Sequence, residues 1–428
     1  MEDHLYSMVS DSVGKNLTQE KLLVILVRMK FKSLGIELTK KQTQGIRLHF
    51  EKYGSNGLEN LSINFTRAQT SYLKRTGQTN LILDFEQSDI DKLDKEIQDI
   101  SNIAIQKIAE GLSDNLLKEW KKQSKGLLKK INTQRKTFNS FHNKVWGKPL
   151  DLLESLIDIS LETGDKFNGK IQSVAVHENN LVFDVVLRLH ARGCQVGSEI
   201  LTLLHHGFAD GAHARWRTLH ELSVLARFIA DNDNKLAERY LDHIAVSEYR
   251  NALTYREYSE QLSYAPMSDE IFNKIKSNRD MVIAKYEKNS DYFKNDYWWA
   301  MDVLGKSNPN FSHIEDKIEI KFMRPFVKLA HINIHADPRG MMIRLGTPPN
   351  NPDLLLAGAS IFGIAEPAQN TAYSMSLLTS SLFSIYKSFD NISFIYAYKK
   401  LTDEVVWLFD QVASSQEANL QQHSANYI

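Results

Sequence analysis

Residues 199–229 read EILTLLHHGFADGAHARWRTLHELSVLARFI, and this stretch determines the kind of fold that we expect. Apolar residues recur on one side of both 199–208 and 212–229, with the spacing of a buried α-helix. Gly207 and Gly211 lie between the two runs and allow a tight turn or a close approach of two helices. The stretch therefore predicts two packed helices inside a helical domain.

The same helical pattern continues on both sides of this stretch. Further helices are predicted over residues 150–161, 180–190, 235–258, 268–286, 322–335, 371–388 and 393–412. The 428 residues include only 9 Pro and 20 Gly, so long helices meet few residues that break them. We predict a mainly α chain with a helical-bundle domain over residues 149–428.

Residues 1–148 are predicted to form a smaller helical domain. Helical spacing is evident over 21–33 and 39–53, and Ser88 with Asp91 approximates a capping box for a helix that ends near Gly111. Short apolar runs at 61–65 and 81–85 leave a short β element open as an alternative. Gly147 and Pro149 mark the expected domain boundary.

This N-terminal domain ends in a basic amphipathic helix over residues 114–146. One face is apolar and the rest is rich in lysine, which suits a phosphate backbone, an acidic partner or a membrane surface; a solvated connecting helix is the plainer interpretation. If the helix contacts RNA or DNA, six side chains carry the contact. They are Lys118, Lys121, Lys122, Lys125, Lys129 and Lys130.

Composition excludes several classes of protein. The 52 Lys and Arg balance the 52 Asp and Glu, so a nucleic-acid surface must be a local patch. Cys194 is the single cysteine, which excludes an internal disulfide framework and a thiolate zinc site. The first residues lack the order of a signal peptide, and no apolar run reaches the roughly 18–20 residues of a membrane span. We expect a cytoplasmic protein that does not bind membranes.

Residues 212–222 concentrate the chemistry of the chain. Arg217 and Glu221 are four positions apart and share a helix face, whereas Arg215 and His220 lie roughly 140° apart. Arg215 and His220 could serve one phosphate if a second copy of the helix crossed the first, so we expect a homodimer. An intrahelical ion pair and a half-buried histidine are the structural alternative.

A second polar cluster follows at residues 331–339. His331 and His335 have the i, i+4 spacing of two metal ligands, with Asp337 or Glu221 as a third, but the Glu of the usual two-histidine motif is absent. We therefore predict no metal and no cofactor, and keep a metal hydrolase as a lesser alternative. His335 and Arg339 are included in the candidate site.

Residues 207–212, 215–222 and 238–243 resemble an uncharacterised bacterial domain-of-unknown-function family, number five-six-seven-seven. Residues 297–300 and 335–340 are similar to its distal motif. The resemblance covers residues 150–412 and implies an all-helical domain with no settled activity. The tandem Trp298 and Trp299 are expected in the core rather than as a platform for bases.

A looser similarity is to the HEPN superfamily of helical nucleases found in toxins and phage-defence systems. Their motif is an Arg followed after four to six residues by a His, which Arg215 and His220 match, although Trp216 fills a slot that is usually polar. The similarity implies that His220 is the general acid/base and that Arg215 stabilises the phosphorane, without a metal.

These observations predict a toxin or phage-defence effector that is a metal-independent endoribonuclease. Its catalytic residues would be His220, Arg215, Arg217, Glu221, His335 and Arg339. The alternative is a noncatalytic helical interaction or sensor module that binds a protein or nucleic-acid partner. The two hypotheses differ in whether the purified protein cuts RNA.

Overall fold

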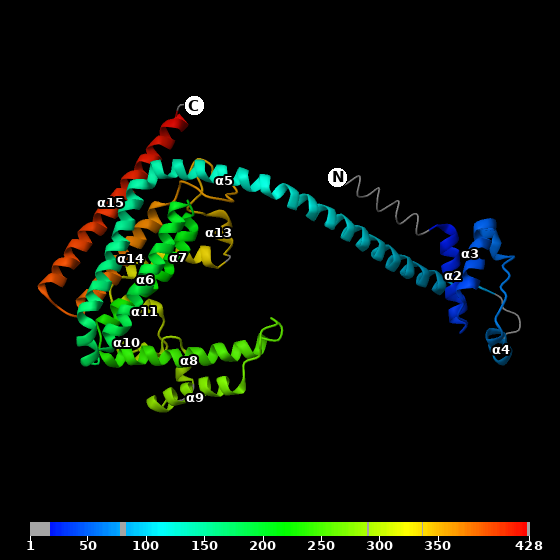
Figure 1. Cartoon of the computed structure of the whole chain (residues 1–428), viewed down its shortest axis with the longest axis horizontal. Helices are drawn as coiled ribbons and strands as arrows, with labels where there is room; N and C mark the ends of the chain where they lie inside the picture. The colour runs from blue at the N-terminus through cyan, green and yellow to red at the C-terminus, as the bar shows by residue number, and fades with distance from the viewer. Residues whose placement is uncertain (1–17, 78–82, 289–290, 336, 426–428) are drawn as a thin grey trace. The chain divides into compact units, whose positions relative to one another are not determined.

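The computed structural model describes residues 18–77, 83–288, 291–335 and 337–425. Within these ranges the regular elements are helices and no strand is formed, which confirms the mainly α prediction (Figure 1). The chain divides into two compact units, Met1–Asn132 and Thr133–Ile428.

The helices of the first unit, in chain order, are α2 (Gln19–Ser33), α3 (Lys40–Tyr53), the 3₁₀ helix η1 (Gly54–Leu58), α4 (Arg67–Arg75) and the first part of α5 (Gln87–His177). Those of the second unit, after the remainder of α5, are α6 (Leu181–His205), α7 (Ala209–Ala230), α8 (Asn234–Tyr258), α9 (Asp269–Tyr286), η2 (Tyr292–Lys294), η3 (Trp298–Ala300), α10 (Met301–Leu304), α11 (Phe311–Lys317), η4 (Lys321–Met323), α12 (Arg324–Ile334), α13 (Pro338–Met342), α14 (Ala365–Ser384) and α15 (Phe389–Ala425).

The first unit has its own small core. Val27 and Phe31 of α2 pack with Ile46 and Phe50 of α3 and with Leu73 of α4, and all five are buried. The helices predicted over 21–33 and 39–53 are confirmed within two residues at each end. Apolar spacing was sufficient for this prediction because each helix has one clear buried face.

The short β element that the sequence left open for the first unit is not formed where it can be checked. Residues 61–65 and 83–85 form no strand, and residues 81–82 lie outside the described residues. Leu61, Ile63 and Phe65 instead pack individually against the first unit's core. A short apolar run indicates burial, but burial does not require a neighbouring strand.

Helix α5 is one continuous element where the sequence predicted a break near Gly111 and a boundary at Gly147 and Pro149. The backbone N–H of Glu86 donates to the Asp89 carboxylate at 3.1 Å at its start, in place of the predicted Ser88 capping box. Pro149 lies inside the helix, and α5 bends in its second half in Figure 1, as an internal proline tends to impose.

The division between the two units falls after Asn132 rather than after Lys148. Trp146 and Leu150 explain the shift, since both are fully buried in the core of the second unit. Trp146 Nε1 also donates to the carbonyl of Ile361 at 2.7 Å. The end of the predicted N-terminal domain is therefore part of the bundle.

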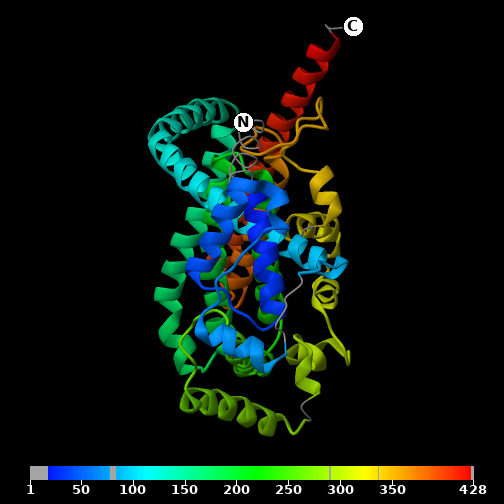
Figure 2. The same cartoon turned by 90° about the vertical axis from the view of Figure 1, so that its right-hand side faces the viewer.

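The second unit is a helical bundle in which α6, α7, α14 and α15 pack side by side with the second half of α5 (Figures 1 and 2). The predicted helices 180–190 and 199–208 join into the single α6. Gly193 in the middle of α6 permits this packing, because a Cβ there would collide with Leu378 of α14. Gly207 ends the turn after α6 with φ +75°, a conformation that favours glycine.

A smaller group of helices, from α8 to α11, covers one part of the bundle around a second core. Trp298 and Trp299 are buried there, which confirms that they pack rather than lie open to bases. Among the described residues, none of the helices is long and apolar enough to cross a membrane.

Candidate functional site

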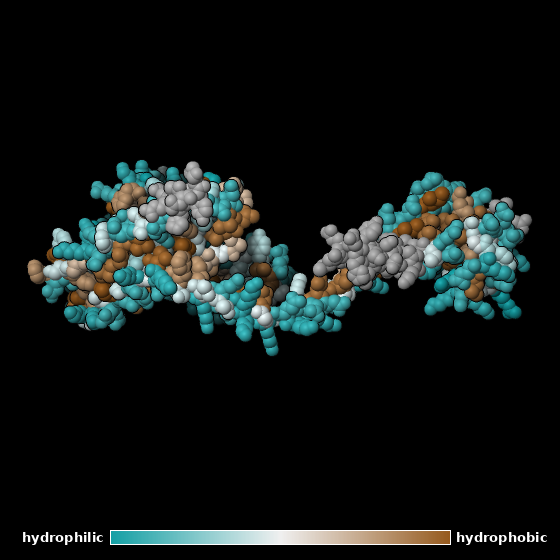
Figure 3. All heavy atoms as spheres, turned by 90° about the horizontal axis from the view of Figure 1, so that it is seen from above, coloured by the Kyte–Doolittle hydropathy of each residue, from teal (hydrophilic) through white to brown (hydrophobic). Residues whose placement is uncertain are grey.

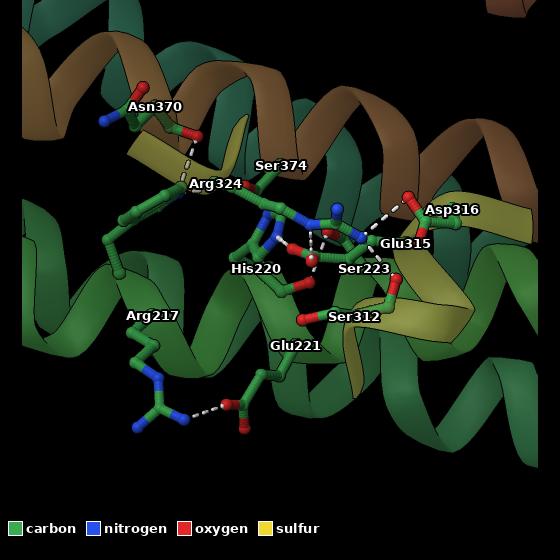
Figure 4. A network of polar contacts seen from close by, with 11 residues as sticks. Arg217, His220, Glu221, Ser223, Ser312, Glu315, Asp316, Arg324, Asn370 and Ser374 are labelled. Carbon is green, nitrogen blue, oxygen red and sulfur yellow. Dashed lines mark hydrogen bonds and ion pairs between the residues drawn. The ribbon is translucent and has the colours of Figure 1, made fainter. Parts of the chain in front are cut away.

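His220 lies on α7 where this helix faces α11 and α14. Its side chain is 2% exposed, and its Nε2 lies 3.0 Å from Glu315 Oε1 of α11 (Figure 4). Glu315 is equally buried. The segment that carries it is a short helix whose N-cap Asn310 accepts a hydrogen bond from the backbone N–H of His313. Two residues that are 95 positions apart thus form a buried His-carboxylate pair.

Arg324 completes this pair from the other side of Glu315. Its Nε donates to Glu315 Oε2 at 2.9 Å, and its Nη2 pairs with Asp316 at 2.8 Å. Burial would raise the pKa of Glu315, but the hydrogen bonds and charges of His220 and Arg324 outweigh it and hold this pKa below its ordinary value. Glu315 is therefore a carboxylate at neutral pH.

An ionised Glu315 fixes how His220 can act. The carboxylate accepts the Nε2–H of the imidazole, so in a neutral His220 the proton sits on Nε2 and Nδ1 carries the lone pair. A carboxylate that orients an imidazole in this way is the usual companion of a histidine general base. Nδ1 is then the nitrogen that can accept a proton.

A pocket of about 380 Å³ opens beside His220. This volume lies in the range of about 300–1,000 Å³ that small-molecule sites occupy. Serine and tyrosine side chains of α14 line one wall, and Lys399 and Asp403 of α15 bring charge to it. The lining residues are His220, Ser223, Ile320, Phe322, Met323, Tyr373, Ser374, Ser376, Leu377, Ser380, Lys399, Thr402 and Asp403.

A strip of polar groups connects α7 with α14 beneath this pocket. Trp216 Nε1 donates to the Asn370 carbonyl and to Ser374 Oγ, each at 2.9 Å. One turn earlier, His213 Nε2 lies 3.7 Å from Glu366 Oε1. Burial lowers the pKa of His213 to about 4, so this imidazole is neutral. Trp216 thus links α7 to α14.

Arg215 is not brought to His220. Its Nε donates to Glu199 of α6, and its Nη1 lies 3.3 Å from Thr218 Oγ1. The side chain is 27% exposed and directed at α6, whereas His220 is directed at α11 and α14. The wide angle predicted between the two residues is therefore retained, and a single chain does not assemble the Arg/His pair.

Arg217 and Glu221 form the predicted intrahelical ion pair at 2.8 Å, and both point away from His220 in Figure 4. Their charges act on His331 of α12 and on Tyr297. Burial, together with the charges of Arg217 and His335, lowers the pKa of His331. Burial and the charge of Glu221 also raise the pKa of Tyr297 to about 12. These residues form a second polar group, separate from the pocket.

His335 and Arg339 lie at the exposed end of this second group. The rings of His331 and His335 are 5.7 Å apart, and Arg339 pairs at 3.2 Å with its neighbour Asp337. Across residues 18–77, 83–288, 291–335 and 337–425, no three His, Cys, Asp or Glu side chains gather as a metal site would require. The histidine pair thus has no third ligand within the described residues.

The six lysines of α5 are exposed on the first unit. The apolar residues between them are exposed as well, including Leu116, Trp120 and Leu127. Figure 3, which shows one face of the molecule, has apolar atoms (brown) at the surface of the stretch that α5 forms, beside hydrophilic atoms (teal). This part of the helix thus exposes an apolar face and a basic face together.

Two of the motifs that carried the family resemblance contact each other. Arg239 Nε donates to the carbonyl of Trp299 at 3.1 Å, and Trp298 Nε1 lies 2.9 Å from His243 Nδ1. Arg239 also stacks on Tyr286, with its guanidinium carbon 5.1 Å from the ring centre. These contacts tie α8 to η3, so the motif residues 238–243 and 297–300 have a structural role.

Comparison with protein families gives one match, to a family of unknown function. Residues 183–352 match the model of DUF5677. The matched segment runs from α6 to the end of α13 and beyond, so it includes His220, Glu315 and Arg324 but not Lys399. It is narrower at both ends than the resemblance over residues 150–412. No curated protein and no solved structure matches the chain.

Sequence reasoning missed three residues of the site, namely Glu315, Arg324 and Lys399. Glu315 lies in the short helix α11, which the sequence did not predict, and Arg324 lies in the predicted helix over residues 322–335 but was not considered as a site residue. Lys399 is one of many exposed lysines. The one sequence signal was the helix-capping residue Asn310, which comes shortly before Glu315.

Proposed function

We propose that the second unit is a metal-independent endoribonuclease in which His220 is the general acid/base. The observation that carries the proposal is the buried His220–Glu315 pair, 3.0 Å apart, in the wall of a pocket large enough for a nucleotide. A catalytic histidine needs a partner that fixes its tautomer, and the ionised Glu315 supplies one. Glu315 is a positioning residue in this scheme.

The chemistry proposed is attack of a ribose 2′-hydroxyl on the adjacent phosphorus. His220 Nδ1 takes the hydroxyl proton, the O2′–P bond forms, and the P–O5′ bond breaks to leave a 2′,3′-cyclic phosphate and a 5′-hydroxyl. Lys399 is the cation of the pocket, so it would balance the charge of the phosphorane and protonate the departing oxygen. Lys399 thereby takes the role that the sequence suggested for Arg215.

Arg215 keeps a role only if a second chain delivers it. Its own chain pairs it with Glu199, and no described contact links it to the pocket. Two versions of the site are therefore possible. In one, Arg215 of the second chain of the proposed homodimer completes the site; in the other, Lys399 of the same chain does. Arg215→Ala abolishes cleavage if the arginine acts across the dimer, and changes it by less than about threefold if Lys399 serves instead, which is the version we favour.

A toxin or phage-defence effector in the cytoplasm is the biological setting that we propose for this activity. It rests on the HEPN-like spacing of Arg215 and His220 and on the exposed lysines of α5 as an RNA track. The alternative, a noncatalytic interaction or sensor module, is favoured by the neutralisation of Arg215 by Glu199 and by the separation of Arg217 from His220.

The test is cleavage of labelled RNA by the purified full chain in the presence of EDTA. We expect cleavage that falls at least about 100-fold in His220→Ala, with His177→Ala as the matched control because His177 is an exposed histidine at the end of α5. Glu315→Gln should reduce the rate and shift its pH profile. A folded chain that binds RNA without cutting it would support the interaction module.

A further inference from the structure

Residues 87–132 of α5 form a long stretch of helix whose apolar side chains are largely open to solvent. The exposed fraction is 45% for Leu116, 65% for Trp120 and 58% for Leu127, and Ile103 and Ile105 are similarly exposed. Scattered apolar residues on a surface are ordinary, but a repeated set along one helix indicates a contact surface.

The apolar side chains of this stretch recur with a fixed period. Ile105, Leu116 and Leu127 are 11 residues apart, as are Leu117 and Leu128, and Trp120 and Ile131. Eleven residues make about three helical turns, so these positions form a stripe that stays on one side of a nearly straight helix. Another helix of the same kind could follow such a stripe over its whole length.

The charges of this stretch are divided into two halves of opposite sign. Between positions 87 and 114 there are seven carboxylates and three lysines, whereas between 115 and 132 there are six lysines and one carboxylate, Glu119. A parallel pair of copies would bring like charges together in both halves. An antiparallel pair brings the acidic half of each copy to the basic half of the other.

The antiparallel arrangement also aligns the apolar residues. With Ile105 of one copy level with Leu116 of the other, Ile90 is level with Ile131. In the same register Asp91 is level with Lys130, and Asp99 with Lys122. One register therefore satisfies both the apolar stripe and the charge pattern.

We propose that residues 87–132 pair with the same residues of a second copy of this chain as an antiparallel two-helix coil. The pairing is independent of the activity proposed for His220. Lys118 and Lys125 lie roughly 160–180° around the helix from the line of Ile105, Leu116 and Leu127, so these lysines stay accessible when that line is covered. RNA alone would leave the apolar stripe in water, and so would not account for it.

Charge-reversed variants of the full chain test this pairing. The acid-reversed variant carries Asp91→Lys, Asp94→Lys and Asp99→Lys, and the base-reversed variant carries Lys122→Glu, Lys125→Glu and Lys130→Glu. Measured by analytical ultracentrifugation, the wild type should be a dimer, and each variant alone should have a dissociation constant raised at least about tenfold. An equimolar mixture of the two variants should recover a heterodimer of nearly wild-type affinity.

Cross-linking tests the direction of the helices. Ile105→Cys mixed with Leu116→Cys should form a disulfide-linked dimer, and Ile105→Cys alone should not; the native Cys194 is buried and does not interfere. A wild-type chain that stays monomeric at about 100 µM, or an Ile105→Cys protein that links to itself, would overturn the proposal. A mixture of the two charge variants that fails to recover the dimer would also overturn it. If the base-reversed variant then loses binding to RNA or to anionic vesicles, the helix binds a polyanion instead.

Discussion

The α7–α14 seam and residues 87–132 of α5 differ in how completely their side chains are covered. Along the seam, Trp216 is fully buried and its indole N–H meets acceptors on α14, whereas Trp120 of α5 is 65% exposed. At the interface of α7 and α14, polar groups are paired with each other within one chain. The α5 stretch has a regular apolar pattern too, but the surface that would cover it belongs to a second copy of the chain. Catalysis requires the first kind of surface and association the second.

The largest effect expected is at Trp216. Trp216→Ala should lower the free energy of unfolding of the second unit by about 3–5 kcal/mol, because it removes a fully buried indole and leaves acceptors on Asn370 and Ser374 unpaired. The matched change Trp120→Ala should alter unfolding by less than about 0.5 kcal/mol and weaken self-association instead. Urea titrations of both variants, monitored by circular dichroism, distinguish the two surfaces; equal losses would contradict the comparison.

A smaller effect on stability is expected at His190, which is buried where α6 packs against α14. Its Nε2 lies 3.0 Å from Ser160 Oγ and 3.5 Å from Thr379 Oγ1, and Cys194 is the other neighbour. Burial lowers the pKa of His190 from 6.5 to about 4, so the folded chain binds this proton less readily than the unfolded chain.

Stability due to neutral His190 is therefore complete above pH 6.5 and is lost as the pH falls through about 4. This loss lowers the free energy of unfolding by at most about 3 kcal/mol, since each pKa unit corresponds to about 1.36 kcal/mol. His190→Gln should flatten the pH dependence of unfolding between these values. If the variant loses stability on acidification as steeply as the wild type does, His190 is not the group responsible.

Glu315→Gln should lower the free energy of unfolding by roughly 1–3 kcal/mol at pH 7. The substitution replaces the carboxylate in the charge-assisted hydrogen bonds with His220 and Arg324 by a neutral amide. The pKa of Glu315 lies below its ordinary 4.5, so its contribution is present above pH 4.5 and is lost as the pH falls through the folded value. Urea midpoints measured from pH 7 to pH 3 should converge for wild type and variant; a constant difference would be inconsistent with an ionised Glu315.

The smallest effects are expected for the exposed ion pairs. Arg215→Ala and Arg339→Ala should each change stability by less than about 1 kcal/mol, because their partners Glu199 and Asp337 are themselves partly solvated. Thermal melts in low and high salt provide the measurement. A loss above about 2 kcal/mol for Arg215→Ala would mean that its pair with Glu199 organises the α6–α7 interface.

The helices with one buried face could be predicted from sequence, as α7 and α8 illustrate, because apolar spacing alone defines them. The continuity of α5 could not. Gly111 faces open space and Pro149 is accommodated by a bend, so residues that normally end a helix do not end this one. The core that holds Trp146 and Leu150 decides where the second unit begins, and that core forms only on folding.

The candidate site was predictable in part for the same reason. The position of His220 on an inward-facing helix turn follows from the apolar residues around it, and the wide angle to Arg215 follows from helix geometry. Its partner Glu315 does not, because the pairing depends on how α11 packs on α7. The cation of the pocket, Lys399, comes from α15, outside the segment that matches DUF5677.

The most direct test of the central claim is RNA cleavage by the full chain in EDTA, comparing wild type, His220→Ala and Lys399→Ala with Arg215→Ala and His177→Ala. The account predicts metal-independent cleavage that yields 2′,3′-cyclic phosphate ends, is lost in the first two variants and persists in the last two. Cleavage that survives His220→Ala, or a folded wild type that never cuts RNA, would contradict it.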